Sequence, residues 1–314
     1  MPSDHVRWKL TERRLLNGGS PGDPVFLVAF ETVEGMGGSW QAGDVVAVDP
    51  WNGSADVAAF LGLLGLDAGA AVFAEDRQTS LAKALAQRNL PRDGDAMAHC
   101  AGLTPQVLVD SLPVLEFRDY SVASVPGDGR VEVLVRQTRG PDGRLGIGSG
   151  WLGTHAPVGE ELAMRLRVVE DFHGPSDDRP MILIGNGTGM AGLRAHLKER
   201  ATAGHRRNWL LFGERTRAFD YHFRADIEAW QASGFLSRVD LAFSRDQPER
   251  VYVQHRLREA APLVRTWIAQ GACVYVCGAL IGMAADVDAT LVEIVGAETV
   301  DRLRTEGAYR RDVY

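Results

Sequence analysis

Two glycine-rich turns in this chain of 314 residues have the composition of phosphate-binding loops. The first, Gly185-Asn186-Gly187-Thr188-Gly189, follows an apolar run at 181–184 and precedes a helical pattern at 190–200. A glycine loop between a buried strand and a helix lets backbone N–H groups approach a phosphate at the helix N-terminus. The second, Gly146-Ile147-Gly148-Ser149, precedes a predicted helix from Trp151 and indicates the same kind of contact.

The segment Arg118-Asp119-Tyr120-Ser121 combines three side chains that suit a ligand with a pyrophosphate and a planar ring. Arg118 offers a fork of donors that matches phosphate oxygens. Two residues further along a strand, Tyr120 points to the same face and offers a ring for stacking. Ser121 adds a hydroxyl. Taken alone, the segment also fits a strand with an exposed arginine and an exposed tyrosine.

A third group of residues suits an extra phosphate on a nucleotide ribose. Ser244-Arg245 ends a predicted strand, and Arg250, Tyr252 and Gln254 follow on a loop that enters a helix. No acidic residue suited to the free ribose hydroxyl of NADH stands at that strand end. Scattered surface side chains are the alternative interpretation. Cys277-Gly278 ends another strand, at the sheet edge where ligands bind, although a buried structural cysteine fits equally well.

Two kinds of secondary structure must position these groups in the first half of the chain. Residues 6–48 have a strand pattern with turns at Gly18-Gly19 and 35–38, and strands return at 116–125 and 131–135. Between them, residues 51–112 predict helices, with Ser54 and Ser80 as N-caps and a third helix at 103–112. The pattern predicts a β-barrel with a small helical insert.

From Arg179 onward, apolar strands alternate with helices. Strands are predicted at 181–184, 209–212, 238–243 and 274–276, and helices at 190–200, 220–232, 253–260 with 263–270, and 284–295. This alternation predicts a doubly wound parallel sheet of about five strands. We therefore expect two domains, residues 1–178 and residues 179–314.

Composition narrows the class of protein. With 45% hydrophobic and 24% charged residues the chain has the composition of a soluble globular protein, and its net charge of −7 gives no footprint for nucleic acid. A basic cluster could receive an acidic partner, but a solvated surface is the favoured interpretation. Its members are His205, Arg206, Arg207, Arg215 and Arg217.

Cysteine spacing and the apolar runs bear on location. Cys273 and Cys277 would lie about 13 Å apart along a strand, beyond disulfide reach, and Cys100 is distant in sequence. Residues 1–5 lack the start of a signal peptide, so we expect the cytoplasm. The longest apolar stretch, 57–73, is broken by Asp67 and by glycines, which argues against a membrane span. We predict no metal site, and the sequence carries no signal for an oligomeric state.

In this order and spacing, these motifs resemble the diflavin-type NADPH reductases of the ferredoxin–NADP reductase superfamily, most of all the flavoprotein subunit of NADPH-dependent sulfite reductase. The ending Asp312-Val313-Tyr314 adds to the resemblance, which covers nearly the whole chain. It implies an FAD-binding antiparallel β-barrel, a shortened helical connecting segment at 51–112, and an NADP-binding domain. It also implies FAD and NADPH as cofactors.

The resemblance assigns roles to individual residues of this chain. The FAD-binding residues are Arg118, Tyr120, Ser121, Gly146, Ile147, Gly148, Ser149 and Tyr314. The NADPH-binding residues are Gly187, Thr188, Gly189, Ser244, Arg245, Arg250, Tyr252 and Gln254. Ser121, Cys277 and Asp312 would steer hydride transfer, and Tyr314 would cover the flavin face that the nicotinamide needs. The chain departs from the family pattern at Gly192, where proline is usual, and at Ala279, where aspartate is usual.

The implied activity is hydride transfer from NADPH C4 to FAD N5, followed by single-electron release to a protein. The family's flavodoxin-like FMN domain has no counterpart in these 314 residues. We therefore expect a separate one-electron partner: a flavodoxin-like or FMN protein, a haem protein or an iron–sulfur protein. Two alternatives remain, a flavin-dependent reductase of ferric chelates or quinones and a non-catalytic FAD-binding subunit.

Overall fold

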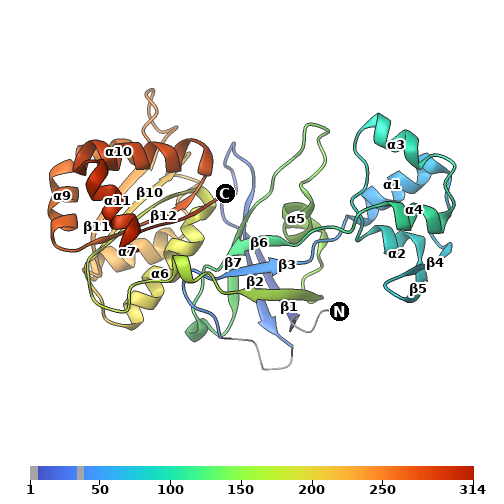
Figure 1. Ribbon diagram of the computed structural model, residues 1–314, viewed down its shortest axis with the longest axis horizontal. Helices are drawn as coiled ribbons and strands as arrows, with labels where there is room; N and C mark the ends of the chain where they lie inside the picture. Colours follow the sequence, from blue (N-terminus) through green and yellow to red (C-terminus); the bar gives the residue numbers. More distant parts are fainter. Residues whose placement is uncertain (1–5, 34–38) are drawn as a thin grey trace.

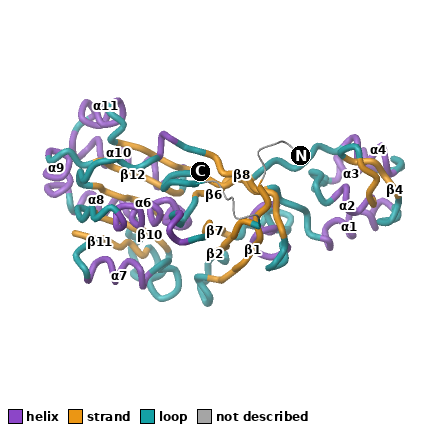
Figure 2. The backbone as a smooth tube through the Cα atoms, turned by 90° about the horizontal axis from the view of Figure 1, so that it is seen from below, coloured by secondary structure: helices purple, strands orange, loops and turns teal. Residues whose placement is uncertain are grey.

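The computed structural model describes residues 6–33 and 39–314. Three bodies lie in a row: an α/β domain, a β-barrel at the centre and a small helical insert at the far end (Figure 1). Figure 2 shows the same row from below. The N-terminal segment at 1–5 and the glycine turn at 35–38, both used in the sequence analysis, lie outside the described residues.

The central body is a six-stranded antiparallel sheet in the order β6-β3-β8-β1-β2-β7. Its strands are β1 (Val6–Leu15), β2 (Val25–Thr32), β3 (Val45–Val48), β6 (Arg118–Ser121), β7 (Val131–Arg136) and β8 (Glu161–Arg167). An antiparallel bridge between Val122 and Val133 joins the two outer strands, so the sheet closes into a barrel. Alternate residues such as Trp8 and Leu10 point inward and are buried, as the two-residue period of a strand requires.

The helical insert leaves the barrel after β3 and returns before β6. It contains α1 (Ser54–Leu64), β4 (Ala71–Ala74), β5 (Arg77–Ser80), α2 (Leu81–Leu85), α3 (Gly94–Cys100) and α4 (Pro105–Ser111). It has a core of its own that includes Phe60, Leu85 and Leu108. Ser80 caps α2 as predicted, since its hydroxyl accepts the N–H of Lys83 at 3.3 Å.

One prediction for the insert was wrong, and one hairpin was not predicted. Ser54 is the first residue of α1, and Gly53 holds the N-cap position without a side-chain bond. A Cβ on Gly53 would come within 2.7 Å of the His155 ring, so packing against the barrel decides this cap. The β4–β5 hairpin was not predicted, because its turn places Glu75 and Asp76 at positive φ without the Asn-Gly or Asp-Gly signal.

The α/β domain carries a five-stranded parallel sheet in the order β11-β10-β9-β12-β13. Its strands are β9 (Met181–Asn186), β10 (Asn208–Glu214), β11 (Leu236–Phe243), β12 (Cys273–Gly278) and β13 (Tyr309–Val313). The helices are α6 (Met190–Thr202), α7 (Arg224–Ala232), α8 (Val253–Glu259), α9 (Ala261–Ala269), α10 (Ala285–Val295) and α11 (Ala297–Thr305). The chain order reverses direction between β9 and β12, and open α/β sheets bind ligands at such a point.

The predicted fold class is confirmed, with two local differences. The helix predicted from residue 220 begins at Arg224, because Phe223 adopts a left-handed φ of 55° and interrupts the helical path. The C-terminal motif is a strand, β13, which pairs in parallel with β12.

Several polar contacts join the barrel to the α/β domain. Lys198 Nζ of α6 lies 2.5 Å from Asp128 Oδ1, and Arg194 Nη1 donates to Glu132 Oε2 at 2.7 Å. His173, between the domains, lies 2.6 Å from Asp44 Oδ1. The first two contacts hold the barrel against helix α6 of the α/β domain.

Candidate active site

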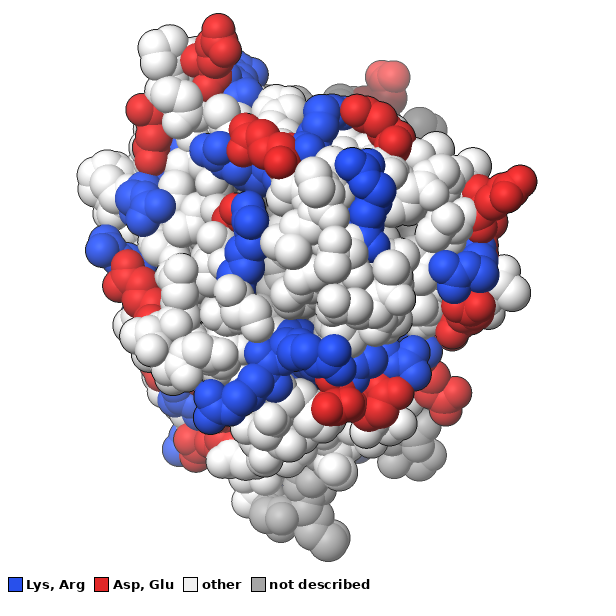
Figure 3. Space-filling view, turned by 90° about the vertical axis from the view of Figure 1, so that its left-hand side faces the viewer, with Lys and Arg blue, Asp and Glu red and all other residues white. Residues whose placement is uncertain are grey.

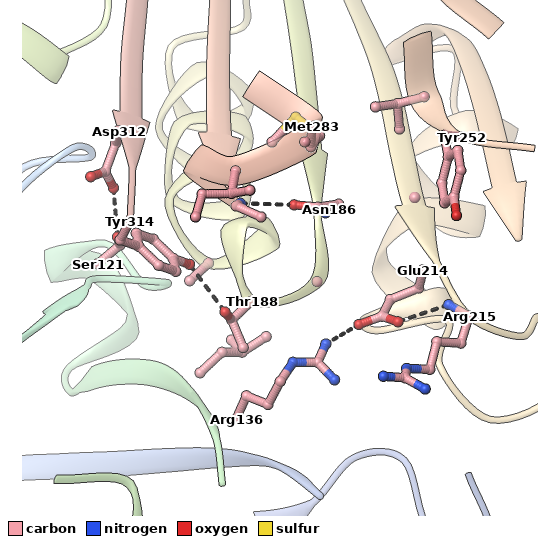
Figure 4. Close-up of a pocket in the computed structure, with 18 of the residues that line it drawn as sticks. Ser121, Arg136, Asn186, Thr188, Glu214, Arg215, Tyr252, Met283, Asp312 and Tyr314 are labelled. Carbon is pink, nitrogen blue, oxygen red and sulfur yellow. Dashed lines mark hydrogen bonds and ion pairs between the residues drawn. The ribbon is translucent and has the colours of Figure 1, made fainter. Parts of the chain in front are cut away.

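A cleft of about 1040 Å³ runs between the barrel and the carboxyl edge of the parallel sheet. The barrel contributes Tyr120, Ser121 and Arg136, and the α/β domain contributes residues that follow β9, β10, β11 and β12 (Figure 4). Because both domains line it, the cleft brings together segments that lie far apart in the sequence.

Ser121, Cys277 and Asp312 meet at one end of this cleft. Ser121 Oγ donates to Asp312 Oδ2 at 2.6 Å, and Cys277 Sγ lies 3.5 Å from the same oxygen. The strand register explains part of the geometry, since Cys277 of β12 pairs with Asp312 of β13. Burial, together with the Asp312 carboxylate, raises the pKa of Cys277 well above the ordinary thiol value. The raised pKa favours the protonated thiol.

Tyr314 lies beside this cluster with its backbone fixed and its ring only lightly held. Its N–H donates to Gly278 O at 3.1 Å, and its carbonyl accepts the N–H of Leu280 at 3.0 Å. The phenol oxygen lies 3.1 Å from Thr188 Oγ1, and the residue is 60% exposed. Figure 4 shows the ring between Ser121 and Thr188. One side-chain hydrogen bond thus holds a ring at the mouth of the cleft.

The Arg118–Tyr120 segment lies against the second glycine turn. A Cβ on Gly148 would come within 2.7 Å of both Arg118 Cγ and the Tyr120 hydroxyl, so only glycine allows this approach. Ser149 Oγ accepts the N–H of Thr138 at 3.1 Å. Arg118 and the turn at 146–149 lie behind Tyr120, outside the lining of the cleft.

The helical turns that follow this glycine turn depend on Arg13 of β1. They comprise α5 (Ile147–Gly150) and the π-helix η2 (Trp151–His155). Arg13 Nε donates to Leu152 O at 2.6 Å, and its guanidinium also bonds to the carbonyls of Thr154 and Ala156. The carbonyl groups at the end of these turns have no partner within the helix, and they accept hydrogen bonds from this side chain of the barrel instead.

The first glycine loop has two functions in the structure. A Cβ on Gly185 would come within 2.6 Å of the Cys277 carbonyl oxygen, and one on Gly189 would overlap that same oxygen. These two glycines are therefore required for packing against β12. Asn186, Gly187, with a φ of 56°, and Thr188 line the cleft and are the members of the loop that a ligand can reach.

The predicted ribose-phosphate residues divide into two groups. Ser244, Arg245, Tyr252 and Gln254 line the cleft, whereas Arg250 is exposed and does not. Gln254 Nε2 donates to Asp286 Oδ2 at 2.9 Å. Its Oε1 is buried and accepts no hydrogen bond in the described part of the chain.

The sequence analysis assigned no role in the cleft to several charged residues that line it, among them Glu214, Arg215 and Arg136. Glu214 and Arg215 stand at the end of β10, where the same strand-end rule could have found them, and Arg136 ends barrel strand β7. Arg136 forms an ion pair with Glu214 across the domain boundary. The N–H of Arg215 donates to the other carboxylate oxygen of Glu214 at 2.7 Å. Despite burial, the neighbouring His222 ring and the charge of Arg136 keep the pKa of Glu214 below its ordinary value.

The predicted basic cluster is dispersed. Arg215 lies in the cleft, Arg217 lies 5.7 Å from the Tyr221 ring, and Arg206 donates to Ser233 O at 3.2 Å. On the outer face of the α/β domain, acidic side chains lie next to a band of basic ones (Figure 3). Ion pairs such as Arg258–Glu293 at 2.9 Å account for part of this mixture.

Both departures from the family pattern lie at the cleft. A Cβ on Gly192 would come within 3.3 Å of Cys277 Sγ and of the Phe172 ring, so this position packs directly beneath the Ser121–Cys277–Asp312 cluster. Ala279 donates its N–H to Asn186 Oδ1 at 3.0 Å and joins two strand-end loops. Next to it, Ile281 is 93% exposed and adds an apolar rim.

Within residues 6–33 and 39–314, no group of His, Cys, Asp or Glu side chains has an arrangement that could hold a metal ion. Over the same residues, no helix has the length and apolar character needed to cross a membrane.

Comparison with known proteins places these features in a family. Residues 183–289 match the family model described as the oxidoreductase NAD-binding domain. The chain is 39% identical over 224 residues to the sulfite reductase (NADPH) flavoprotein alpha-component of Vibrio cholerae serotype O1, which covers 66% of this chain and 36% of the relative. It is 32% identical over 337 residues to the protein of the same name from Aliivibrio fischeri, which covers 90% of this chain and 56% of the relative.

The chain therefore spans between about a third and just over half of the length of these curated relatives. The barrel, the parallel sheet with its glycine loop, and the sequence matches agree. The chain belongs to the ferredoxin–NADP reductase-like family of oxidoreductases, and sulfite reductase flavoprotein alpha-components are among its relatives.

Proposed function

We propose that this protein binds FAD and NADPH and passes electrons from NADPH to a separate one-electron protein acceptor. The observation that carries the proposal is the meeting of Ser121, Cys277 and Asp312, from three separate segments, beside Tyr314 and a glycine loop. The names of the relatives, which are NADPH-dependent flavoproteins, support the same activity.

The residues of the barrel fit FAD. The turn at 146–149 approaches Tyr120 and Arg118 so closely that a Cβ on Gly148 would fill the space, so the turn and the Arg118 side chain would serve one pyrophosphate. Tyr120 and Tyr314 both line the cleft and offer two aromatic faces to a planar ring. When bound, FAD supplies the chemistry of accepting a hydride from a nicotinamide and releasing its electrons one at a time.

The residues of the α/β domain fit NADPH. Gly187 and Thr188 would hold the pyrophosphate, and Ser244, Arg245 and Tyr252 would hold the ribose 2′-phosphate. The buried Gln254 Oε1, which accepts no hydrogen bond from the described residues, suits a donor such as the adenine amino group.

The chain's own groups would set distance, orientation and charge at the reacting end. The Ser121 hydroxyl lines the cleft and donates its one hydrogen to Asp312, so its oxygen is left to accept a hydrogen bond from a ring N–H. The neutral Cys277 thiol is buried beside it and brings no second negative charge close to the Asp312 carboxylate. The Tyr314 ring must leave its position before a nicotinamide can stack there, and one hydrogen bond to Thr188 opposes that movement.

We propose a flavodoxin-like or FMN protein, or a haem or iron–sulfur protein, as the acceptor. The relatives are named as alpha-components of sulfite reductase, and a component of this kind implies a further protein that receives its electrons. A reducing compartment such as the cytoplasm accords with three buried free cysteines, Cys100, Cys273 and Cys277.

The test begins with the flavin that acid releases from the purified protein, which should be FAD without FMN. Cytochrome c reduction should then be measured with NADPH and NADH, with and without added flavodoxin. Reduction that is faster with NADPH and stimulated by flavodoxin supports the proposal. Reduction of ferric chelates or quinones alone would favour a small-acceptor reductase, and bound FAD without turnover would favour a non-catalytic subunit.

A further inference from the structure

We propose that Arg136, a residue of the barrel domain, binds the pyrophosphate of the nucleotide held by the glycine loop of the other domain, and that Glu214 positions it. This inference rests on the proposed binding of NADPH and assigns one more ligand to the same site.

Arg136 reaches across the domain boundary into the nucleotide half of the cleft. It is the last residue of β7, yet its guanidinium pairs with Glu214 at the end of β10. One of its terminal nitrogens lies 3.1 Å from the position that a Cβ on Gly187 would occupy. The guanidinium therefore contacts the part of the glycine loop that faces the cleft, where a pyrophosphate bound by that loop would lie.

Glu214 fixes the direction of the Arg136 side chain. The Glu214 side chain is only 5% exposed, and both of its oxygens are engaged, one by Arg136 and the other by the N–H of Arg215. His222 Nε2 lies 3.6 Å from the oxygen that pairs with Arg136. A carboxylate held at so many points has little freedom, so it holds the guanidinium at the loop before any ligand arrives.

The charge balance around Glu214 favours an anion. In Figure 4 the side chains of Arg136 and Arg215 converge on the same side of the Glu214 carboxylate. Two guanidinium groups face one carboxylate, which leaves a net positive charge at the floor of the cleft. Arg136 keeps several of its five N–H donors for a second partner, and a guanidinium matches the paired oxygens of a pyrophosphate.

Other ion pairs between the domains lie elsewhere. Lys198–Asp128, at 2.5 Å, also joins α6 to the barrel, but neither residue lines the cleft. An ion pair that served only to hold the domains together would have no need to face the glycine loop. The position of Arg136 therefore points to a ligand in addition to Glu214.

The test compares Arg136→Ala with Lys198→Ala, which removes an interdomain ion pair away from the cleft. Binding of NADP⁺ and of NAD⁺ to the flavin-loaded protein is measured by calorimetry, and folding is checked by thermal denaturation. Both nucleotides carry a pyrophosphate, so Arg136→Ala should weaken both by about 10- to 100-fold, the range expected for a lost hydrogen bond to a charged group. Lys198→Ala should leave both dissociation constants unchanged.

Glu214 provides a second measurement that does not depend on the first variant. Arg136→Ala leaves the Glu214 carboxylate unpaired and repulsive, so adding Glu214→Gln should recover part of the lost affinity. The single variant Glu214→Gln keeps an oxygen that accepts from Arg136 but loses the charge that holds it, so it should weaken binding of both nucleotides by less than Arg136→Ala does. Unchanged binding of both nucleotides would refute the positioning role. Selective loss of NAD⁺ binding in that variant would show instead that Glu214 holds a ribose hydroxyl, and would overturn its positioning role.

The outcomes separate this inference from the proposed function. A wild-type protein that binds neither nucleotide refutes the proposed function. A wild-type protein that binds NADP⁺, with Arg136→Ala binding it equally well, refutes the role of Arg136 alone. Equal losses in Arg136→Ala and Lys198→Ala would show that both act only by holding the domains together.

Discussion

The two walls of the cleft are built in different ways. On the barrel side, Tyr120 and Arg118 pack against Gly148 so tightly that a single added carbon would collide with both. On the other side, Arg245 and Tyr252 are exposed and lie at the two ends of the loop between β11 and α8, with no packing between them of the kind seen at Gly148. The first wall is formed by the fold itself. The second is a set of donors that only a ligand would bring into full contact, which suits a nucleotide that binds and leaves.

The contrast breaks down at Gly189, which belongs to the nucleotide loop but packs like the barrel wall. Gly189→Ala would drive a Cβ into the Cys277 carbonyl oxygen, a backbone atom that cannot turn aside. We expect the free energy of unfolding to fall by about 3 kcal/mol, the upper part of the range for overpacking. Chemical denaturation measures this change in the free energy of unfolding.

Gly62→Ala is the matched control for that substitution. Gly62 lies in α1 with no neighbouring atom within 4 Å of an added Cβ. The change should be neutral or stabilising by up to about 1 kcal/mol. A Gly189→Ala protein as stable as the wild type would mean that the loop can move away from β12, and that packing does not explain the glycine at position 189.

A substitution at Arg245 tests the nucleotide side of the cleft. If its guanidinium binds the 2′-phosphate, Arg245→Ala should raise the KM for NADPH by about 10- to 100-fold with little change for NADH. The sequence analysis assigned the same role to Arg250, but that residue is exposed outside the cleft. Arg250→Ala should therefore have a much smaller effect, and steady-state kinetics with both nucleotides decides. Equal losses for NADPH and NADH in Arg245→Ala would contradict the 2′-phosphate assignment.

A substitution at Gly148 tests the barrel side of the cleft. In Gly148→Ala the new Cβ meets the Arg118 side chain and the end of the Tyr120 side chain, which can shift. The stability cost should therefore be about 1 kcal/mol, the low end for overpacking. The shift displaces both groups that are proposed to hold the flavin, so the flavin-to-protein absorbance ratio should fall while the protein remains folded. Full flavin content would place the cofactor away from this turn.

Tyr314 lies where the two walls meet, and its effect should be the smallest. Moving the ring costs one hydrogen bond to Thr188, about 0.5 to 1.5 kcal/mol. Tyr314→Ala should therefore raise activity with NADH by a few-fold and tighten apparent binding of both nucleotides. Tyr314→Phe, which keeps the ring but loses the bond, is the matched control. Unchanged NADH kinetics in Tyr314→Ala would mean that the ring does not cover the flavin.

The contrast between the walls also explains how much the sequence could predict. Motifs at the ends of strands, such as Gly187-Thr188 and Ser244-Arg245, were found because a parallel sheet brings its carboxyl ends to one edge. Arg136 was missed because its strand belongs to the other domain, and only the docking of the two domains brings it to the glycine loop. The same holds for Gly53, whose conformation is decided by His155, a residue 102 positions later.

Arg13 has a consequence for the protein without its flavin. Its guanidinium holds the carbonyls of Leu152 and Thr154, so the turns after Gly146 are closed by a barrel side chain and not by the cofactor. The apoprotein should therefore keep this turn assembled when the flavin is stripped by chaotropic salt and gel filtration. Reconstitution would then be a docking event onto a finished surface, rapid and complete, with no slow refolding phase in the recovery of flavin absorbance.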